Sequence, residues 1–443
     1  MYFSLSQLSE ILDTQPLCTA KFDLNTSVLG ITTDTRTIAP QEIFIALSGE
    51  NFDGHNFVNT AVAKGAIAVI VSQPLNVNLP QFIVKNTLEA YQQIALWWRD
   101  RFNIPVIGIT GSVGKTSTKE LVSAVLSTKG KVLKTEANFN NEIGVPKTLL
   151  QITPEHDYAV IEMAMRAAGE IALLTDIARP TIGIITNVGT AHIGRLGSRE
   201  AIAKAKCELL AQMPQSSTAI LNYDNSLLLS TAKQVWQGKT ITYGLTGGDI
   251  EGGIEGDTIK VLGHNFPLPL SGEHNGSNYL AALAVARELD LDLAPLIAGL
   301  KVELPKGRSR RYNLPNDVVI LDETYNAGLE SMLAALNMLE QTPGKRHIAV
   351  LGTMKELGEY SSKLHRQVGE KARELDLDLL LVLADETVTT EIASGAEGID
   401  TQCFSDRAIL TDKLKQVMRP GDRILCKASN SVGLNEVVEE LIK

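Results

Sequence analysis

The segment Val106-Ile-Gly-Ile-Thr-Gly-Ser-Val-Gly-Lys-Thr-Ser-Thr118 constrains the fold of this chain more than any other. An apolar, β-branched run ends at Thr110, and a glycine-rich turn, a lysine and hydroxyl residues follow it. Because Gly111 and Gly114 have no Cβ, backbone N–H groups of such a turn can close on phosphate oxygens. A helix that begins here directs the positive end of its dipole at the same anion. The segment therefore predicts a strand, a phosphate-binding loop and a helix.

The spacing of this loop is shorter than the usual Walker pattern. That pattern requires glycine at position 109, which is isoleucine, and the chain has Thr110-Gly-Ser-Val-Gly-Lys-Thr116 instead. Lys115 can supply a positive charge to a phosphate, and Thr116 can place its hydroxyl on Mg²⁺. A plain glycine turn between a strand and a helix is the alternative interpretation.

Composition and charge exclude several classes of protein. The chain has 443 residues, 44% of them hydrophobic, so it can bury large cores and should divide into about two to four domains. The net charge of −10 argues against a general nucleic-acid or anionic-membrane binder. The cysteines are too scattered for a metal-ligand pair or a disulfide framework. No leader or bilayer-spanning run is recognisable, so we expect a cytoplasmic protein without membrane insertion. We also expect no nucleic-acid partner and a monomer.

Apolar runs and turn residues divide the chain into three blocks, residues 1–85, 86–310 and 311–443. The first mixes short strands with a helix, and the other two alternate strands and helices as parallel sheets with covered faces do. Strands are expected at residues 43–47, 66–71, 82–84, 106–110, 158–161, 182–188, 219–222, 318–321, 348–351, 379–384 and 423–426. Helices are expected at residues 57–64, 87–102 and 278–289, a hairpin or loop at 244–256, and a linker at 304–308.

Several polar residues of the second block are candidates for chemistry. Glu162 follows an apolar strand, at the edge where ligands bind open α/β sheets, so it is either a Mg²⁺ ligand or an ordinary acid at a helix start. His192 follows another strand and can bind a metal or orient a phosphate, although a lone histidine there is more often structural. Lys204 and Lys206 lie on a predicted helix, where lysines usually form a solvated face.

An asparagine cluster precedes the next apolar segment. The amides of Asn138, Asn140 and Asn141 suit a polar ligand that needs paired donors and acceptors, and turn chemistry explains them equally well.

Polar motifs in the outer blocks can also contact ligands. Thr33-Asp-Thr-Arg36 and Asp53-Gly-His55 offer hydroxyls, a guanidinium and turn backbone for a diphosphate or a sugar. Asp322 and Glu323 follow a strand of the third block, where ribose hydroxyls or an ammonium group could be their partner.

In order along nearly the whole chain, these motifs resemble the Mur ligase family. The matching segments are Thr33-Asp-Thr-Arg36, Phe44-Ile-Ala-Leu47, Asp53-Gly-His55, Thr110-Gly-Ser-Val-Gly-Lys-Thr116, Asn138-Phe-Asn-Asn-Glu-Ile-Gly-Val-Pro146, Ile161-Glu-Met163, Thr186-Asn-Val188, Ala191-His192, Ala205-Lys206, Gly272-Glu-His-Asn275, Asn278, Lys306-Gly-Arg308, Tyr325-Asn-Ala327, Leu351-Gly352 and Glu356-Leu-Gly-Glu359.

The resemblance implies an α/β fold of three domains. These are a small α/β UDP-binding domain (1–85), a central P-loop ATPase-like domain with a parallel sheet (86–310) and a C-terminal Rossmann-like domain that receives a dipeptide (311–443). The implied activity is an ATP-dependent ligase of peptidoglycan precursor synthesis. It would join D-alanyl-D-alanine to UDP-N-acetylmuramoyl-tripeptide through an acyl phosphate.

The resemblance also implies residue roles. Lys115, His192 and Lys206 would be catalytic, with Lys206 carbamylated, and two Mg²⁺ ions would be bound by Thr116, Glu162, His192 and the carbamate. Residues implied to bind the nucleotide are Gly111, Ser112, Val113, Gly114, Lys115, Thr116, Ser117, Asn278, Arg308, Asp322 and Glu323. Residues implied to bind the other substrates are Thr35, Arg36, Asp53, His55, Asn138, Asn140, Asn141, Tyr325 and Asn326.

Four positions depart from the usual motifs of the family. Gly194 replaces an acid, and Asn326-Ala-Gly-Leu329, Gly352-Thr-Met354 and Lys427-Ala-Ser-Asn430 replace Asn-Ala-Asn-Pro, Gly-Asp-Met and Lys-Gly-Ser-Arg. Three of the four lie in the third block, so they concern the amine substrate rather than ATP. Two alternatives follow: a Mur-like or folylpolyglutamate-synthase-like ligase with a different amine, and a non-catalytic paralogue that binds nucleotide or precursor.

Overall fold

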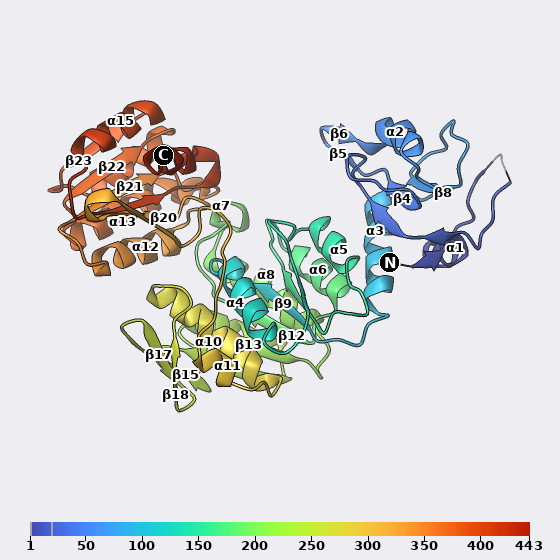
Figure 1. Cartoon of the computed structure of the whole chain (residues 1–443), viewed down its shortest axis with the longest axis horizontal. Helices are drawn as coiled ribbons and strands as arrows, with labels where there is room; N and C mark the ends of the chain where they lie inside the picture. Colours follow the sequence, from blue (N-terminus) through green and yellow to red (C-terminus); the bar gives the residue numbers. More distant parts are fainter. Residues whose placement is uncertain (1, 19–20) are drawn as a thin grey trace. The chain divides into compact units, whose positions relative to one another are not determined.

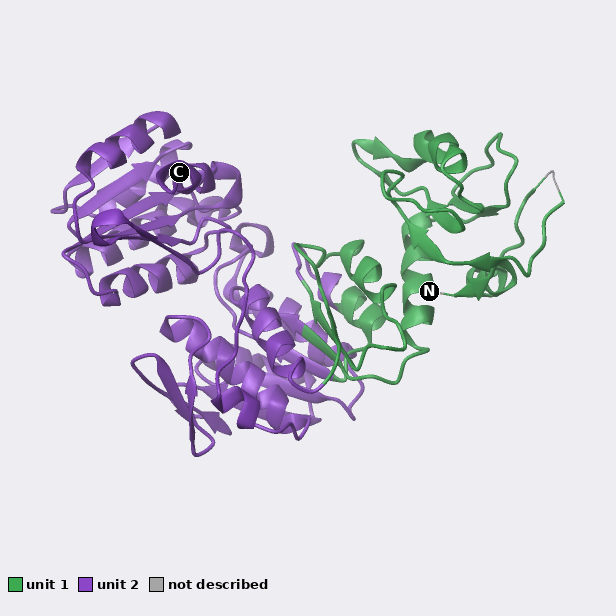
Figure 2. Cartoon of the chain, in the orientation of Figure 1, with its two compact units in different colours: residues 1–108, 130–163, 172–181 green, residues 109–129, 164–171, 182–443 purple. Residues whose placement is uncertain are grey.

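A computed structural model describes residues 2–18 and 21–443. The chain forms two compact units, shown in green and purple in Figure 2. Unit 1 contains the described residues up to 108 together with 130–163 and 172–181, and unit 2 contains 109–129, 164–171 and 182–443. Within the described ranges, no helix is long and apolar enough to cross a membrane.

The N-terminal part of unit 1 is a small parallel sheet with helices. Its strands β3 (Gly30–Thr32), β4 (Glu42–Ile45), β7 (Ala68–Val71) and β8 (Gln81–Ile83) are parallel in that order. The other elements are β1 (Phe3–Ser4), α1 (Leu5–Leu12), β2 (Ser27–Val28), β5 (Ser48–Gly49), β6 (Phe52–Asp53), the 3-10 helix η1 (Gly54–Phe57), α2 (Val58–Ala63) and α3 (Thr87–Arg99). Phe44, Val58 and Val69 bury the contact between this sheet and α2. The three strands and two helices predicted before residue 103 are confirmed, with bounds that differ by at most three residues at either end.

The remainder of unit 1 contributes parallel strands in the order β10-β11-β9. These are β10 (Val132–Lys134), β11 (Tyr158–Glu162) and the first residues of β9 (Val106–Thr110). The Ala159 N–H donates to the carbonyl of Pro105 at 3.1 Å. Helices α5 (Gly144–Leu149) and α6 (Glu170–Ala178) follow β10 and β11 in the chain. Every side chain of β9 is buried, as its unbroken apolar run predicts for a strand covered on both faces.

The first half of unit 2 continues with parallel strands in the order β9-β12-β13-β14-β15. They are β12 (Ile182–Ile185), β13 (Thr218–Asn222), β14 (Lys239–Gly244) and β15 (Ile250–Glu251). The helices are α4 (Lys115–Leu126), α7 (Ile193–Leu196), α8 (Arg199–Gln212), α9 (Ser226–Val235), α10 (Glu273–Glu288) and α11 (Ala294–Ile297). Strands β16 (Gly253–Glu255), β17 (Thr258–Val261) and β18 (His264–Pro267) form a separate antiparallel sheet.

One prediction for this region is wrong in its bounds. The helix expected to begin at residue 278 begins at Glu273, because Gly272, with φ 96°, supplies the turn that starts it. The hairpin or loop expected at 244–256 is confirmed in part: β14 ends at Gly244 and a loop leads to β15, whereas the β16–β17 hairpin, which turns at Gly256, extends beyond that range.

The second half of unit 2 is a six-stranded sheet in the order β19-β20-β24-β21-β22-β23. The strands are β19 (Arg310–Leu314), β20 (Val318–Asp322), β21 (Arg346–Gly352), β22 (Leu379–Leu383), β23 (Thr401–Phe404) and β24 (Asp422–Lys427). The helices are α12 (Leu329–Gln341), α13 (Ser361–Glu374), α14 (Glu391–Gly395), α15 (Arg407–Val417) and α16 (Leu434–Leu441), with 3-10 helices η2 (Pro315–Asp317), η3 (Gly358–Tyr360), η4 (Thr387–Thr390) and η5 (Asn430–Val432). Figure 1 shows α15 on one face of this sheet and α12 with α13 on the other.

The edge strand β19 was not predicted. It pairs antiparallel with β20, and its residues are half-buried or exposed, so the polar run Arg310-Arg-Tyr-Asn lacks the apolar pattern of a core strand. The other strands of this sheet are parallel, as expected for a doubly wound domain.

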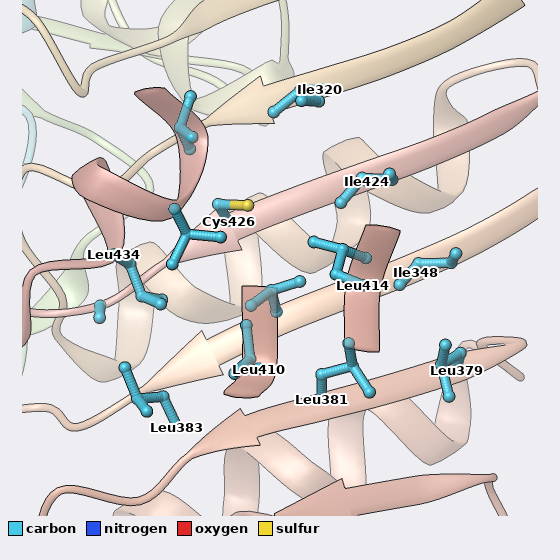
Figure 3. Packing of buried hydrophobic residues seen from close by; sticks show 14 of the residues in the cluster. Ile320, Ile348, Leu379, Leu381, Leu383, Leu410, Leu414, Ile424, Cys426 and Leu434 are labelled. Carbon is cyan, nitrogen blue, oxygen red and sulfur yellow. The ribbon is translucent and has the colours of Figure 1, made fainter. Parts of the chain in front are cut away.

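Leucine side chains of α15 and β22 meet in the core of this sheet (Figure 3). Leu410 and Leu414 of α15 pack into one buried cluster with Ile348 and Leu381. We expect Leu381→Ala to destabilise the six-stranded sheet and its helices by about 2–5 kcal/mol. The variant loses the transfer free energy of the removed methyl groups and also the packing contacts around the cavity that they leave. Urea titration followed by hydrogen exchange at β21 and β22 measures the change. Ile409→Ala on the same helix is the control, since that side chain is 61% exposed; equal losses in the two variants would contradict the assignment of this core.

Candidate active site

The loop that follows β9 has the geometry of a phosphate-binding loop. Gly114 has φ 81°, a conformation that favours glycine, and a Cβ there would lie 2.6 Å from the Asn278 side-chain oxygen. A Cβ at Gly111 would overlap the Thr186 hydroxyl. Helix α4 begins directly at Lys115 and has no side-chain cap from Gly114. The N-terminus of a twelve-residue helix thus directs its dipole at the loop, as the sequence predicts.

The segment after β12 holds this loop in place. Val113 donates its N–H to the Asn187 side-chain oxygen at 3.0 Å, and its carbonyl accepts from the Thr186 hydroxyl at 2.6 Å. Ser112 donates its N–H to the Asn187 carbonyl at 3.1 Å, and its hydroxyl accepts from the Gly189 N–H at 2.8 Å. The loop therefore has a defined shape before any ligand binds, which lowers the entropic cost of binding.

Lys115 and Asn278 both lie close to the phosphate loop. The Lys115 ammonium donates to the carbonyl of Gly111 at 2.8 Å, so it lies over the loop where a phosphate would bind. Asn278 of α10 accepts from the Thr118 hydroxyl of α4 at 3.2 Å and donates to Asn275 at 3.4 Å. The structure thus brings Asn278 beside the phosphate loop, although 160 residues separate it from Thr118.

His192 and Lys206 share the electrostatic environment of Lys115. Burial lowers the pKa of His192, and the charges of Lys115 and Lys206 lower it further, so the neutral imidazole is favoured. Burial, with a smaller contribution from Lys115, holds the pKa of Lys206 well below its usual value. Lys206 is 2% exposed, so the expectation of a solvated lysine face is wrong for Lys206 and correct for the exposed Lys204.

Glu162, in unit 1, is a buried carboxylate at the last position of β11. Its N–H donates to the Thr135 hydroxyl at 3.0 Å, and its Oε1 accepts from the Asn140 amide at 2.8 Å. Asn140 therefore orients Glu162.

Asn141 has a different role from Asn140. Its side-chain oxygen accepts from the N–H of Gly144 at 2.9 Å at the start of α5, so it follows the turn interpretation of the asparagine cluster.

The N-terminal candidates form two local clusters. The exposed Arg36 guanidinium pairs with Asp34 through Nε and Nη2, and this pairing lowers the pKa of Asp34 to about 2. His55 Nδ1 lies 2.6 Å from Asp53, and its Nε2 accepts from the Ser72 N–H at 2.9 Å. Both ring nitrogens of His55 thus have protein partners, so this histidine shapes the loop around Asp53.

Arg308 and Tyr325 stack in the C-terminal half of unit 2. The Arg308 guanidinium carbon lies 3.9 Å from the centre of the Tyr325 ring. Its Nε is buried, and among the described residues it has no hydrogen-bond partner. A buried guanidinium donor without a protein acceptor is what a phosphate or carboxylate ligand would satisfy.

The two acids after β20 have different partners. Asp322 is buried and accepts from the Thr324 hydroxyl at 2.6 Å and its N–H at 3.1 Å, and burial raises the pKa of Asp322. Glu323 accepts from the hydroxyl and N–H of Ser309, at 3.0 and 3.1 Å.

Asn275, Lys427 and His274 lie near these candidates, and the sequence indicates them only as members of longer motifs. Asn275 donates to the Ser309 hydroxyl at 3.3 Å, and Lys427 donates to the Asn326 carbonyl at 2.9 Å. Burial lowers the pKa of His274 and of Lys427. The sequence features that could have identified these three residues are the motifs Gly272-Glu-His-Asn275 and Lys427-Ala-Ser-Asn430.

The donors suit Mg²⁺ bound together with phosphates. Among the described residues, no group of three His, Cys, Asp or Glu side chains could hold a metal ion by itself. Mg²⁺ at nucleotide sites takes only one or two protein ligands and completes its shell with phosphate and water oxygens. Taken separately, the Thr116 hydroxyl of unit 2 and the Glu162 carboxylate of unit 1 are each an oxygen donor of that type.

These features define a class: an α/β protein whose glycine-rich loop and helix N-terminus bind the phosphates of a nucleotide. Three family models match the chain. They are the Mur ligase family catalytic domain at residues 27–108, the Mur ligase middle domain at 109–286 and the Mur ligase glutamate ligase domain at 307–430.

The chain belongs to the Mur ligase family. It is 58% identical over 442 residues to the UDP-N-acetylmuramoyl-tripeptide–D-alanyl-D-alanine ligase of Synechocystis sp., covering 99% of this chain and 97% of that protein. It is 37% identical to the Escherichia coli ligase of the same name, covering 99% and 98%. The crystal structure of MurF from Acinetobacter baumannii matches with a TM-score of 0.91 at 30% identity, covering 100% and 99%. MurF from Thermotoga maritima, in complex with ADP, matches with a TM-score of 0.83 at 29% identity, covering 93% and 96%.

Proposed function

We propose that this chain is the ATP-dependent ligase that joins D-alanyl-D-alanine to UDP-N-acetylmuramoyl-tripeptide. The observation that carries the proposal is the 58% identity to a ligase of that name along practically the whole length of both chains. The phosphate loop, the buried Lys206 and the lowered pKa of His192 support it. Relatives named for this reaction also favour the dipeptide over the alternative amines, despite the departures at residues 326–329, 352–354 and 427–430.

The first chemical step is activation of a carboxylate. A tripeptide carboxylate oxygen attacks the γ-phosphorus of ATP, an O–P bond forms, and ADP leaves with the electrons of the broken bond. Carboxylate and ATP are both anionic, so cations must hold them together. Lys115 and the N-terminus of α4 supply positive charge at the phosphate loop.

The second step forms the amide. The free amine of the dipeptide attacks the acyl carbon, phosphate departs, and the nitrogen loses a proton. Water would hydrolyse the acyl phosphate, so the site must exclude it while the dipeptide is bound. Tyr325 and Asn326 are the proposed contacts of the dipeptide.

Lys206 is proposed to react with CO₂ as a neutral amine. Its nitrogen bonds to the carbon of CO₂ and releases a proton, which converts a lysine into an anion. Burial already favours the neutral amine that this reaction requires. Thr116, Glu162, His192 and the carbamate are the proposed holders of two Mg²⁺ ions, which when bound neutralise phosphate charge.

The remaining assignments divide the substrates among three domains, 1–85, 86–310 and 311–443. Thr35, Arg36 and Asp53, with the loop that His55 shapes, are proposed to bind the UDP-sugar, and Asn138, Asn140 and Asn141 to lie along the peptide. The nucleotide is proposed to contact residues 111–117, Asn278, Arg308, Asp322 and Glu323. We propose that the protein acts as a cytoplasmic monomer.

Phosphate release tests the function directly. With ATP and UDP-N-acetylmuramoyl-tripeptide, addition of D-alanyl-D-alanine is expected to raise the steady-state release rate at least about tenfold, because the amine turns over the acyl phosphate. Mass spectrometry should find one pentapeptide product for each phosphate. Release that does not depend on the dipeptide, but does depend on another amine, would establish the different-amine alternative. Nucleotide binding without release under any amine would establish a non-catalytic paralogue.

A further inference from the structure

Residues 189–197, called here the 189–197 segment, contact both the phosphate loop and the C-terminal half of unit 2. The Gly189 N–H donates to the Ser112 hydroxyl of the phosphate loop at 2.8 Å. The next residue, Thr190, donates its N–H and its hydroxyl to the two carboxylate oxygens of Glu330, at 2.7 and 3.1 Å. Glu330 lies in the first turn of α12. Two adjacent residues therefore connect the loop that binds phosphate with a helix of the six-stranded sheet.

The close approach of the 189–197 segment to the C-terminal half of unit 2 depends on two glycines, Gly189 and Gly194. A Cβ at Gly189 would lie 2.5 Å from the carboxyl carbon of Glu330. A Cβ at Gly194 would lie 2.5 Å from the backbone nitrogen of Gly358. Glycine at position 194 therefore leaves room for the close backbone approach of Gly358.

A second anchor holds the other end of the 189–197 segment. Glu356 Oε2 lies 2.6 Å from His192 Nδ1, and the Glu356 carbonyl accepts from the Gly194 N–H at 3.3 Å. The Tyr360 hydroxyl donates to the Gly197 carbonyl at 2.9 Å. His192 and Glu356 both have positive φ, 65° and 63°, although neither is glycine. Such backbone persists only where the surrounding structure holds it.

We propose that the 189–197 segment couples occupancy of the phosphate loop to docking of the C-terminal half of unit 2, and that Glu330 is the positioning residue of this coupling. A phosphate bound at residues 111–116 fixes Ser112, and Ser112 fixes the Gly189 N–H. The neighbouring Thr190 then presents two donors to Glu330. Because the acceptor is ionised and Thr190 is 7% exposed, the bond is worth more than a neutral surface bond.

The coupling acts in both directions. If a bound nucleotide favours docking through Glu330, docking must raise the affinity for the nucleotide by the same factor. Glu330 therefore influences the phosphate loop without touching it, through Thr190 and Gly189. It also helps to hold the 189–197 segment, which contains His192.

Hydrogen exchange in the full-length protein tests the coupling with ADP as the probe. In the unmodified chain, ADP is expected to slow amide exchange at residues 189–197 and at 328–332. In Glu330→Ala, exchange of the Thr190 amide should rise about 10- to 100-fold, the equivalent of losing a hydrogen bond to a charged group. ADP should no longer slow exchange at 328–332, and its affinity should fall.

Two variants separate coupling from a general loss of stability. Glu340→Ala removes an exposed carboxylate from the same helix and should leave exchange and ADP affinity unchanged. Glu330→Gln keeps an acceptor for the Thr190 N–H, and should recover part of the ADP-dependent protection even if Glu330→Ala folds poorly. Protection at 328–332 that is as strong in both Glu330 variants as in the unmodified chain would overturn the proposal.

The kinetic readout alone rests on the proposed function. Glu330→Ala is expected to lower kcat for dipeptide-dependent phosphate release by about 10-fold or more, while KM for the dipeptide changes less, because assembly of the site rather than dipeptide contact is affected. Unchanged kcat with lost protection would overturn the link between coupling and turnover. An unmodified chain that shows ADP protection but no dipeptide-dependent release would instead refute the proposed function and leave the coupling supported.

Discussion

Replacing Lys206 with alanine is expected to lower dipeptide-dependent phosphate release by about 100- to 1,000-fold, the range for loss of one preorganised electrostatic group. Lys206 is 2% exposed and lies in the field of Lys115, so no solvent group can take the place of its proposed carbamate. In the variant, we expect a short carboxylate such as formate or acetate to occupy the space that the lysine side chain leaves. We therefore expect added carboxylate to restore part of the lost rate, with saturation, in an initial-rate assay.

The neighbouring lysine provides a matched control for this variant. Lys204 is on the same helix, α8, and is exposed, so Lys204→Ala should retain the unmodified rate and should not respond to acetate. Omitting CO₂ and bicarbonate should slow the unmodified protein and leave Lys206→Ala as it is. Full activity of Lys206→Ala would remove the carbamate from the mechanism without affecting the assignment of the phosphate loop.

Replacing Lys115 with methionine is the second change with a large expected effect. Methionine keeps much of the length and volume of the side chain but has no charge, so the variant isolates electrostatics from packing. We expect kcat to fall about 100- to 1,000-fold, because the ammonium that offsets phosphate charge is lost. The Kd for ATP should rise by a smaller factor, since the backbone N–H groups and the α4 N-terminus still contribute to binding.

Lys129, an exposed residue shortly after α4, provides the control for Lys115. Lys129→Met changes the net charge equally and should leave kcat and Kd within about twofold, because an exposed charge is screened by solvent. Fluorescent-nucleotide titration and phosphate release measure the two quantities separately. A Lys115→Met variant that turns over normally would show that the loop binds phosphate without using this lysine.

The sequence predicted best those features that depend on neighbours in the chain. The strand at 106–110 was predicted residue for residue, because an unbroken β-branched run ending in glycine leaves few alternatives. The sequence did not predict edge strand β19, because its half-exposed polar residues show no alternation of apolar and polar side chains. Its pairing with β20 stabilises it instead. The start of α10 was not predicted for a related reason, since residues 273–277 contain no apolar side chain that would indicate a helix, and the turn at Gly272 starts it.

The residues of the candidate site show the same difference between what the local sequence predicts and what packing decides. Lys206 and Lys204 are two residues apart on one helix, and local sequence gives them the same surface role. Only the packing of α8 buries one ammonium and exposes the other. Asn141 and Asn140 likewise differ by one position, yet the first accepts from the backbone N–H of Gly144 and the second donates to Glu162.

By itself, the sequence determined the phosphate loop, the alternation of strands and helices, and the order of motifs along the chain. These follow from local sterics: glycine where the backbone must turn tightly, and β-branched residues where a strand is covered on both faces. Tertiary structure alone decided which polar groups are desolvated and which of them meet. The pKa of Lys206, the burial of Arg308 Nε without a partner among the described residues, and the contact of Glu330 with Thr190 all depend on residues distant in sequence. Charge and hydrogen bonding act through space, so their strength depends on burial and distance, which no local pattern encodes.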